Sequence, residues 1–334
     1  MKITVYSAQA YDERFLDEAF HSLSGEHAVQ LTYQKARLTP ETVVLAEGSE
    51  AICVFVNDLL NGEVLEALHA RGVRAVLLRC AGFNNVDMVA ATRLGFFVAR
   101  VPAYSPEAVA EHTLALVMTL NRHTHRAYNR VREGNFMLDG LLGFTVHGKT
   151  VGIVGIGKIG LAVARIFKGM GCRVLGYDPS GSEAFKTVGE HVSLADLLAQ
   201  SDIVTLHCPL TNATRHMIDA QALAKMKSGA MLVNTSRGAL IDTPAVIAAL
   251  KRRHLGALAI DVYEQESELF FHDRSSDIID DDVFQRLMTF PNVLVTGHQG
   301  FFTIEAMREI AGVTLRNWTC FADGAPCENL VQVP

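Results

Sequence analysis

A glycine-rich turn that follows an apolar run lies in the middle of the 334-residue chain and constrains its fold more than any other segment. Residues 151–160 read Val-Gly-Ile-Val-Gly-Ile-Gly-Lys-Ile-Gly, and an amphipathic helical pattern follows. In such a pattern Gly155 permits a tight turn, Gly157 lets the backbone approach a pyrophosphate, and Gly160 lets the helix pack closely on its strand. The amides at the start of the helix then face the phosphates. The segment therefore predicts the strand, turn and helix of a dinucleotide-binding fold.

A second strand and a terminal acid complete this unit. The apolar residues 174–177 end at Asp178, which lies 18 residues after Gly160. A carboxylate at this place bonds the ribose hydroxyls of a dinucleotide and repels the additional phosphate of NADP. Because no basic residue stands beside Asp178, the pattern predicts NAD as the cofactor. The alternative, an ordinary glycine turn, would require neither the flanking strands nor the acid.

The position of this unit in the middle of the chain implies a second domain. A length of 334 residues suits about two domains, each able to bury its own core. With 49% hydrophobic and 20% charged residues the composition is that of a soluble globular enzyme, and the net charge of −6 disfavours nucleic acid as a partner. The first six residues resemble a strand rather than a signal peptide, and no apolar run approaches the roughly 20 residues of a membrane span. We therefore expect a cytoplasmic protein without a membrane partner.

Cysteine and histidine residues indicate neither a disulfide framework nor a metal site. The six cysteines are scattered through apolar segments without CxxC spacing, which favours buried thiols in a reducing compartment. The 13 histidines show no HExxH or other ligand spacing. No metal is therefore expected.

Two alternations of apolar runs with helical segments predict two parallel sheets, because continuous apolar strands between helices are typical of sheets covered on both faces. The strands of the first are expected at residues 3–6, 29–33, 51–56, 75–78 and 96–101. The second is expected to have six strands, near residues 150–155, 173–177, 203–207, 231–234, 257–261 and 293–296.

Two further helices determine the predicted domain boundaries. One long helix is expected from Pro106 to about Glu133, capped by Ser105 and closed near Gly134. The last helix, residues 303–323, is expected to return to the N-terminal domain. The predicted fold is thus α/β, with two Rossmann-like or flavodoxin-like doubly wound parallel-sheet domains and an active-site cleft between them. Residues 1–102 with 300–334 would form a discontinuous substrate-binding domain, and residues 103–299 the NAD-binding domain.

Polar residues follow three strands of the second domain, where an open parallel sheet places its ligands. Arg237 offers a rigid fork that fits a carboxylate, Glu264 and Glu266 follow the next strand, and His298 is suited to proton transfer near neutral pH. Each alone has an ordinary structural explanation: a surface salt bridge, a solvated acidic turn or a loop histidine. Together with a nicotinamide site they supply an anion clamp, a proton donor and a partner for that donor, as carbonyl reduction requires.

Five segments extend this pattern to a known family. Residues 234–242, 261–266 and 296–301 resemble the three catalytic motifs of the D-isomer-specific 2-hydroxyacid dehydrogenases, while residues 78–87 and 101–112 resemble their substrate loop and interdomain helix. The resemblance covers nearly the whole chain. It extends to the bacterial fermentative D-lactate dehydrogenases, which share the Leu-Phe-Phe segment at residue 269 and the acidic stretch up to residue 283.

This resemblance implies roles for individual residues. Arg237 would orient the substrate and polarise its carbonyl, His298 would donate the proton, and Glu266 rather than Glu264 would be its partner. The other implied substrate-binding residues are Phe55, Arg79, Ala81, Gly82, Tyr104 and Phe301, with the backbone amides of Ala81 and Gly82 holding the carboxylate. The implied cofactor-binding residues are Gly155, Gly157, Lys158, Ile159, Gly160, Asp178, Cys208, Pro209, Thr214, Thr235, Ser236 and Asp261.

Some positions keep a structural alternative or depart from the family. Phe55 and Phe301 could be ordinary core aromatics, and Tyr104 could be only the last loop residue before a capped helix. Thr214 stands where relatives often carry Asn, which puts its cofactor contact in doubt, and Gly297 replaces the commoner Pro before the catalytic His. Cys80 beside the substrate loop is expected to pack rather than react, since nothing nearby would activate a thiolate.

The function that follows is reduction of a small 2-oxo acid, pyruvate above all, to the D-hydroxy acid by NADH. Reductases of the same family that act on glyoxylate, hydroxypyruvate, phosphoglycerate or branched 2-oxo acids are alternatives. Formate dehydrogenases share the fold but carry Gln where Glu266 stands. NAD-sensing corepressors also resemble the family. The family generally pairs through the nucleotide-binding domain, so a homo-oligomer, dimer or tetramer, is implied.

Overall fold

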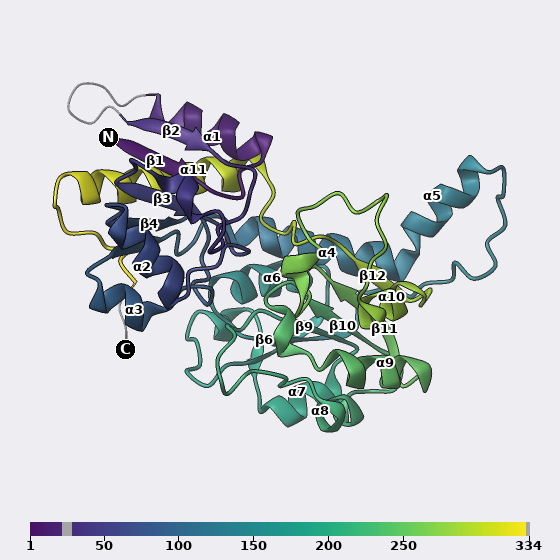
Figure 1. Ribbon diagram of the computed structural model, residues 1–334. Helices are drawn as coiled ribbons and strands as arrows, with labels where there is room; N and C mark the ends of the chain where they lie inside the picture. The colour runs from purple at the N-terminus through teal and green to yellow at the C-terminus, as the bar shows by residue number, and fades with distance from the viewer. Residues whose placement is uncertain (22–28, 332–334) are drawn as a thin grey trace. The chain divides into compact units, whose positions relative to one another are not determined.

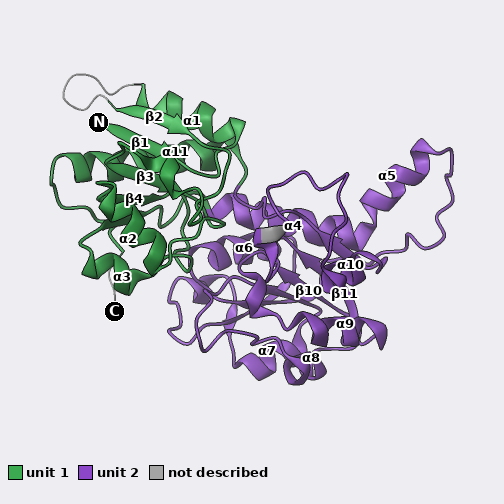
Figure 2. Cartoon of the chain, in the orientation of Figure 1, with its two compact units in different colours: residues 1–105, 302–334 green, residues 106–301 purple. Residues whose placement is uncertain are grey.

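The computed structural model describes residues 1–21 and 29–331, and the chain divides into two compact units (Figure 2). Unit 1 comprises Met1–Ser105 and Phe302–Pro334, and unit 2 comprises Pro106–Phe301. Each unit contains one parallel sheet with helices in its crossover connections (Figure 1). The predicted α/β class with two parallel sheets is confirmed.

Unit 1 is built on a five-stranded sheet with the order β2-β1-β3-β4-β5. All residues of its β3 and β4 strands are buried, which explains their unbroken apolar sequences. The strands are β1 (Lys2–Val5), β2 (Gln30–Tyr33), β3 (Ala51–Val54), β4 (Ala75–Leu78) and β5 (Phe97–Arg100). The helices of the N-terminal part are α1 (Ala10–Phe20), α2 (Gly62–Ala70) and α3 (Met88–Arg93).

The last helix of the chain belongs to this first unit. Helix α11 (Ile304–Ala322) begins at the N-cap Thr303 and packs against α1, β4 and β5. Its Trp318 is fully buried. Beyond the helix the chain runs along β5, where Leu330 forms an antiparallel bridge with Ala99. The C-terminal segment thereby covers the edge of the sheet.

Unit 2 is built on a seven-stranded parallel sheet with the order β12-β11-β10-β9-β6-β7-β8. The strand order reverses between β6 and β9, the switch point at which such sheets bind ligands. The strands are β6 (Thr150–Val154), β7 (Arg173–Tyr177), β8 (Glu190–His191), β9 (Ile203–Leu206), β10 (Ala230–Asn234), β11 (Leu255–Ile260) and β12 (Val293–Val295). The helices between them are α6 (Lys158–Gly169), α7 (Leu194–Gln200), α8 (Ala220–Lys225), α9 (Thr243–Lys251) and α10 (Asp282–Met288).

The prediction of six strands in this sheet was wrong by one. The additional strand β8 has only two residues, both exposed and polar, and it pairs with β7 at the edge of the sheet. A two-residue edge strand has no apolar periodicity that a sequence pattern could reveal.

The single long helix predicted for residues 106–133 was also wrong. Helix α4 (Pro106–Arg122) ends before His123, whose φ of +52° is left-handed, and α5 (Thr124–Arg132) then continues in another direction (Figure 1). The side chain of Asn121 bonds the returning backbone at Phe144 through both its amide and its carbonyl, at 2.8 and 2.9 Å. Helix α4 buries eight residues whereas α5 buries none, so packing holds only the first helix against the core.

Candidate functional site

The glycine turn after β6 has no room for side chains at two of its three glycines. Gly155 has a φ of +91°, and a Cβ there would lie 2.5 Å from the backbone nitrogen of Cys208. A Cβ on Gly160 would lie 2.0 Å from the carbonyl oxygen of Gly155, so the helix packs directly on the turn. A Cβ on Gly157 would meet nothing within 4 Å. The open side of the turn is therefore at Gly157, the N-cap of α6, where a phosphate could approach the helix amides.

Asp178 lies directly behind this turn. It follows the end of β7, and its Oδ2 accepts a hydrogen bond from the backbone amide of Ile156 at 3.2 Å. Its Oδ1 accepts another from the amide of Ser180 at 2.9 Å. Lys158 and Ile159 are the first two residues of α6. The residues predicted to bind the phosphates and the ribose thus lie together at the carboxyl ends of β6 and β7, and their geometry fits a dinucleotide.

The loops after β9 and β10 are tied to each other beside the glycine turn. The Ser236 hydroxyl donates to the carbonyl of Cys208 at 2.7 Å, and the Thr235 hydroxyl lies 3.0 Å from that of Thr113 on α4. Burial raises the pKa of Cys208 to about 11, so its thiol stays protonated near neutral pH. The Thr214 hydroxyl closes its own loop by donating to the carbonyl of Pro209 at 2.7 Å.

Arg237 projects from the turn after β10. The buried Asn234 holds this turn, because its side-chain amide donates to the carbonyl of Arg237 at 2.8 Å and its carbonyl accepts from the amide of Ser236 at 3.0 Å. A Cβ on Gly238 would lie 2.1 Å from the backbone carbon of Tyr263, so only glycine fits against the neighbouring strand end. The Arg237 guanidinium donates to the carbonyl of Ser236 at 2.7 Å.

Glu266 and His298 form a hydrogen-bonded pair. His298 Nδ1 and Glu266 Oε1 are 2.7 Å apart, and the other carboxylate oxygen accepts from the amide of Tyr263 at 2.9 Å. Both side chains are mostly buried. The ring centres of Phe271 and Phe301 lie 5.9 and 6.4 Å from the centre of the His298 imidazole. Within the described residues His298 Nε2 makes no hydrogen bond, which leaves it available to an external partner.

Glu264, the neighbouring acid, faces elsewhere. Its carboxylate pairs with Arg215 and, at 3.0 Å, with His216. The local backbone therefore directs only one of the two acids toward His298.

Asp261 is the centre of a hydrogen-bond network that holds the turn carrying His298. Its side chain is 2% exposed, and the carboxylate accepts bonds from His112 of α4, from the Thr296 hydroxyl and from the amides of Gln299 and Gly300. Its backbone carbonyl accepts the amide of His298 at 2.7 Å. Burial opposes ionisation of Asp261, but the bonds from His112 and Thr296 outweigh it and lower the pKa of the carboxyl.

The remaining predicted residues lie in unit 1, around the ends of β3 and β4. The Arg79 guanidinium is buried, bonds Asp12 at 3.1 Å and lies 5.0 Å above the centre of the Phe55 ring. Ala81 and Gly82 follow in the loop after β4, and Tyr104 lies between β5 and α4. The structure thus gathers two groups of predicted residues, one in each unit.

Some structural contributors were missed by sequence reasoning. His112 and Asn234 lie inside motifs that were recognised, but nothing in their spacing indicates which neighbour they bond. The Phe271 ring contacts the His298 ring from the Leu-Phe-Phe segment, to which the sequence pattern assigns no role. The contacts of His112 and Phe271 join residues far apart in the chain, so local patterns do not reveal them. The bonds of Asn234 are local, but they depend on the shape of the turn after β10.

Comparison with known proteins gives a consistent result. A family model described as the NAD binding domain of D-isomer specific 2-hydroxyacid dehydrogenases matches residues 114–300. The chain is 60% identical to 2-hydroxyacid dehydrogenase A of Aspergillus oryzae, over 98% of this chain and 94% of that protein. It is 51% identical to D-lactate dehydrogenase of Escherichia coli, over 98% and 99% of the two chains. The apo-structure of the Escherichia coli D-lactate dehydrogenase superposes with a TM-score of 0.90, covering 99% of this chain and 100% of that one.

Proposed function

The chain belongs to the NAD-dependent D-isomer-specific 2-hydroxyacid dehydrogenases, and we propose that within this family it reduces pyruvate to D-lactate with NADH. The pair of His298 and Glu266, 2.7 Å apart and mostly buried, is the observation that carries the proposal. Reduction of a carbonyl needs a proton donor. A carboxylate bonded to Nδ1 stabilises the protonated imidazolium, which is the form of His298 that can donate the proton.

The residues proposed to bind the substrate suit the carboxylate, the carbonyl and a small third substituent of a 2-oxo acid. Arg237 offers two parallel donors to a carboxylate and can polarise the adjacent carbonyl. The amides of Ala81 and Gly82 would bind the same carboxylate. The Phe55 and Phe301 side chains would limit the size of the third substituent. A methyl group such as that of pyruvate suits such a limit, and discrimination by a methylene is worth about 1–3 kcal/mol.

The proton step belongs to His298. When bound, the reduced nicotinamide supplies the hydride. His298 would hold a proton on Nε2, which has no hydrogen-bond partner among the described residues, and release it to the developing alkoxide. Glu266 keeps the ring oriented through Nδ1, while the amides of Gln299 and Gly300 anchor its loop on Asp261.

Two alternative reactions are oxidation of formate and reduction of another 2-oxo acid. Hydride removal from formate needs no proton donor, so the carboxylate of Glu266 favours 2-oxo acid reduction over formate oxidation. Glyoxylate, hydroxypyruvate and branched 2-oxo acids share the carboxylate and carbonyl of pyruvate and differ only in the third substituent.

A panel of 2-oxo acids tests the proposal directly. NADH oxidation is measured with pyruvate, glyoxylate, hydroxypyruvate and 2-oxoisocaproate, and the chirality of the product is determined. We expect the highest kcat/KM with pyruvate and D-lactate as the product. A higher kcat/KM with any other member would reassign the substrate, and an L product would overturn the proposal of D-lactate.

His298→Ala tests the proton donor. It should lower kcat by about a hundredfold or more, the scale of general acid catalysis.

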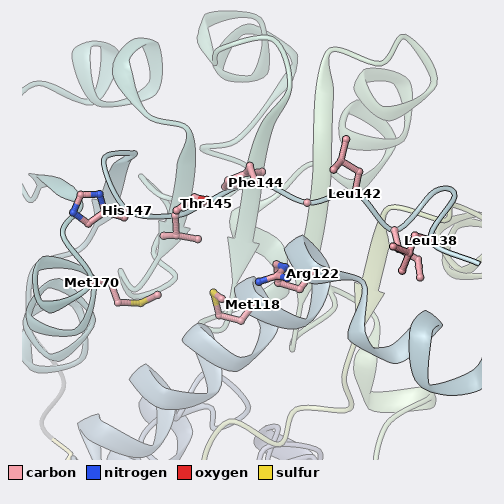
Figure 3. A pocket seen from close by; sticks show the side chains of 11 residues that line it. Met118, Arg122, Leu138, Leu142, Phe144, Thr145, His147 and Met170 are labelled. Carbon is pink, nitrogen blue, oxygen red and sulfur yellow. The ribbon is translucent and has the colours of Figure 1, made fainter. Parts of the chain in front are cut away.

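We further propose that the chain forms a homo-oligomer through the arm, defined as α5 with the returning residues 133–145. The arm exposes Tyr128, Phe136, Leu138 and Leu142, the last 92% exposed. Beside it lies a pocket of about 660 Å³ between the end of α4 and the returning chain, with Met118, Leu142 and Met170 in its wall (Figure 3). Large exposed apolar groups on a projecting segment favour a protein partner, and a second copy offers the same surface in return.

A further inference from the structure

In the loop after β4, three successive backbone carbonyls accept hydrogen bonds, whereas the three successive amides at residues 81–83 donate none within the described residues. The carbonyl of Cys80 accepts from the amide of Val101 at 3.2 Å, and the carbonyl of Gly82 accepts from the thiol of Cys80 at 3.2 Å. Between them, the carbonyl of Ala81 accepts from Arg100 Nη1 at 2.8 Å. In the described chain the amides of Ala81, Gly82 and Phe83 donate no hydrogen bond. Successive amides left without an acceptor form a site for an anion.

The bond from Arg100 determines the direction in which one of these amides points. The carbonyl of Ala81 and the amide of Gly82 belong to one planar trans peptide, in which oxygen and hydrogen point to opposite sides. A guanidinium that anchors the oxygen therefore turns the Gly82 N–H away from itself. It also polarises the peptide, so the N–H becomes a stronger donor.

Arg100 is itself held in place from two sides. Its backbone amide donates to the carbonyl of Asn329 at 3.1 Å, and its carbonyl accepts from the buried Asn317 of α11 at 2.9 Å. Its guanidinium carbon lies 5.1 Å above the centre of the Phe83 ring. The edge strand β5 and the C-terminal segment thus fix Arg100, and Arg100 fixes the loop.

We propose that Arg100 is a positioning residue for the substrate carboxylate, acting through the Ala81–Gly82 peptide without touching the substrate. The inference rests on the proposed function, in which the amide of Gly82 binds that carboxylate. Any 2-oxo acid carries this group, so the role of Arg100 does not depend on which of them is preferred.

Arg100→Met tests the role, because methionine keeps an apolar stem near Phe83 and removes the charged donor. We expect KM for pyruvate and Kd for the pyruvate isostere oxamate, measured by calorimetry on the NADH-loaded enzyme, to rise together by about 10- to 100-fold, the range of one charged hydrogen bond. Kd for NADH, kcat and Tm should stay near wild type. Arg100→Lys keeps a cation within reach and should recover most of the affinity. The matched control is Arg93→Met, which removes an exposed arginine of the same unit that forms a surface ion pair with Glu66.

Three results would overturn the inference. The first is a KM for pyruvate within twofold of wild type in Arg100→Met. The second is a parallel loss of NADH affinity and Tm, which would make the residue only a fold element. The third is an Arg100→Lys variant no better than Arg100→Met. If the substrate panel selects another 2-oxo acid, the proposal of pyruvate fails and the same comparison is made with that acid, so the two failures are distinguishable.

Discussion

His298 occupies a backbone conformation that is uncommon for residues other than glycine. Its φ is +54°, in the left-handed region, where a residue with a side chain costs about 1–2 kcal/mol. Hydrogen bonds to Asp261 compensate this cost. The Asp261 carboxylate accepts from the amides of Gln299 and Gly300, and the Asp261 backbone carbonyl accepts from the amide of His298. A Cβ on the preceding residue, Gly297, would meet no atom within 4 Å. The turn thus presents the ring to Glu266 at hydrogen-bond distance.

Exchanging the two acids for their amides separates their roles. Glu266→Gln keeps the shape but removes the charge that would stabilise an imidazolium, so we expect kcat/KM for pyruvate to fall by about a hundredfold. Glu264→Gln should stay within about threefold, because Glu264 pairs with Arg215 and His216 on the protein surface. Steady-state kinetics at neutral pH measures both. Equal losses in the two variants would contradict the assignment.

The glycines of the turn after β6 offer a second matched pair. Gly160→Ala would place a methyl group 2.0 Å from the carbonyl oxygen of Gly155, so we expect lower Tm and weaker NADH binding. Gly157→Ala has open space around its Cβ and should keep Tm near wild type while weakening NADH binding, measured by fluorescence titration. A Gly157→Ala variant that binds NADH as tightly as wild type would mean that no phosphate approaches this position.

The pH dependence of stability should reveal the buried Asp261. Because its folded-state pKa is lowered, its contribution is present above the unfolded pKa, about 4, and is lost as pH falls through the folded value. Asp261→Asn cannot accept from Gly300 with its NH₂ group, so we expect it to lose about 1.5–3 kcal/mol near pH 7 and less below pH 4. Thermal unfolding of both proteins between pH 3 and 8 measures this difference. A constant difference across that range would contradict an ionised Asp261.

At the scale of elements, the break between α4 and α5 separates a packed helix from an exposed one. Helix α4 is held by contacts with α6, whereas the basic α5 buries no residue and is tied to the returning chain by the bond from Arg130 Nη1 to the carbonyl of Asp139 at 2.7 Å. The first bonds of α5 go to the carbonyl of His123, from the amides of Arg126 and Ala127. The left-handed residue is therefore the point at which the direction of the arm is set.

Substitutions at residue 123 test this break. Asparagine adopts the left-handed region readily, so His123→Asn should keep Tm close to wild type. Valine is branched at Cβ and disfavours this region, so His123→Val should cost about 1–2 kcal/mol of unfolding free energy. Thermal or urea unfolding distinguishes them. Equal stability of the two variants would mean that the chain does not turn at this residue.

At the scale of the whole molecule, each unit has its own sheet, its own core and its own group of functional residues. Unit 2 gathers the glycine turn, Arg237 and the pair of His298 and Glu266 at strand ends of one sheet. Unit 1 gathers the residues that hold the loop after β4, where the amides at 81–83 donate no bond to any described residue. No helix in the described part of the chain is long and apolar enough to cross a membrane.

The arm provides the test of the proposed assembly. Leu142→Asp places a charge on its most exposed apolar side chain, and we expect the oligomer to dissociate in sedimentation velocity while the circular dichroism stays unchanged. Ile278→Asp is the control, since Ile278 is 94% exposed but lies outside the arm. A wild-type protein that sediments as a monomer, or a Leu142→Asp variant that sediments like wild type, would count against the arm as the interface.

Local sequence patterns were enough to predict the α/β class and the two parallel sheets, because unbroken apolar runs between helical segments indicate buried parallel strands, and the glycines 155, 157 and 160 together with Asp178 indicated NAD as cofactor. The family came from the resemblance of several motifs, and the comparisons confirm it. The proposed roles of Arg237, Glu266 and His298 came from a resemblance and stay predictions. The structure was needed to show that β8 extends the sheet and that the chain turns at His123. It was also needed to show that His112 bonds Asp261 and that Arg100 bonds Ala81. Each of these depends on a contact between residues distant in the chain or on packing that is present in one helix and absent in the next.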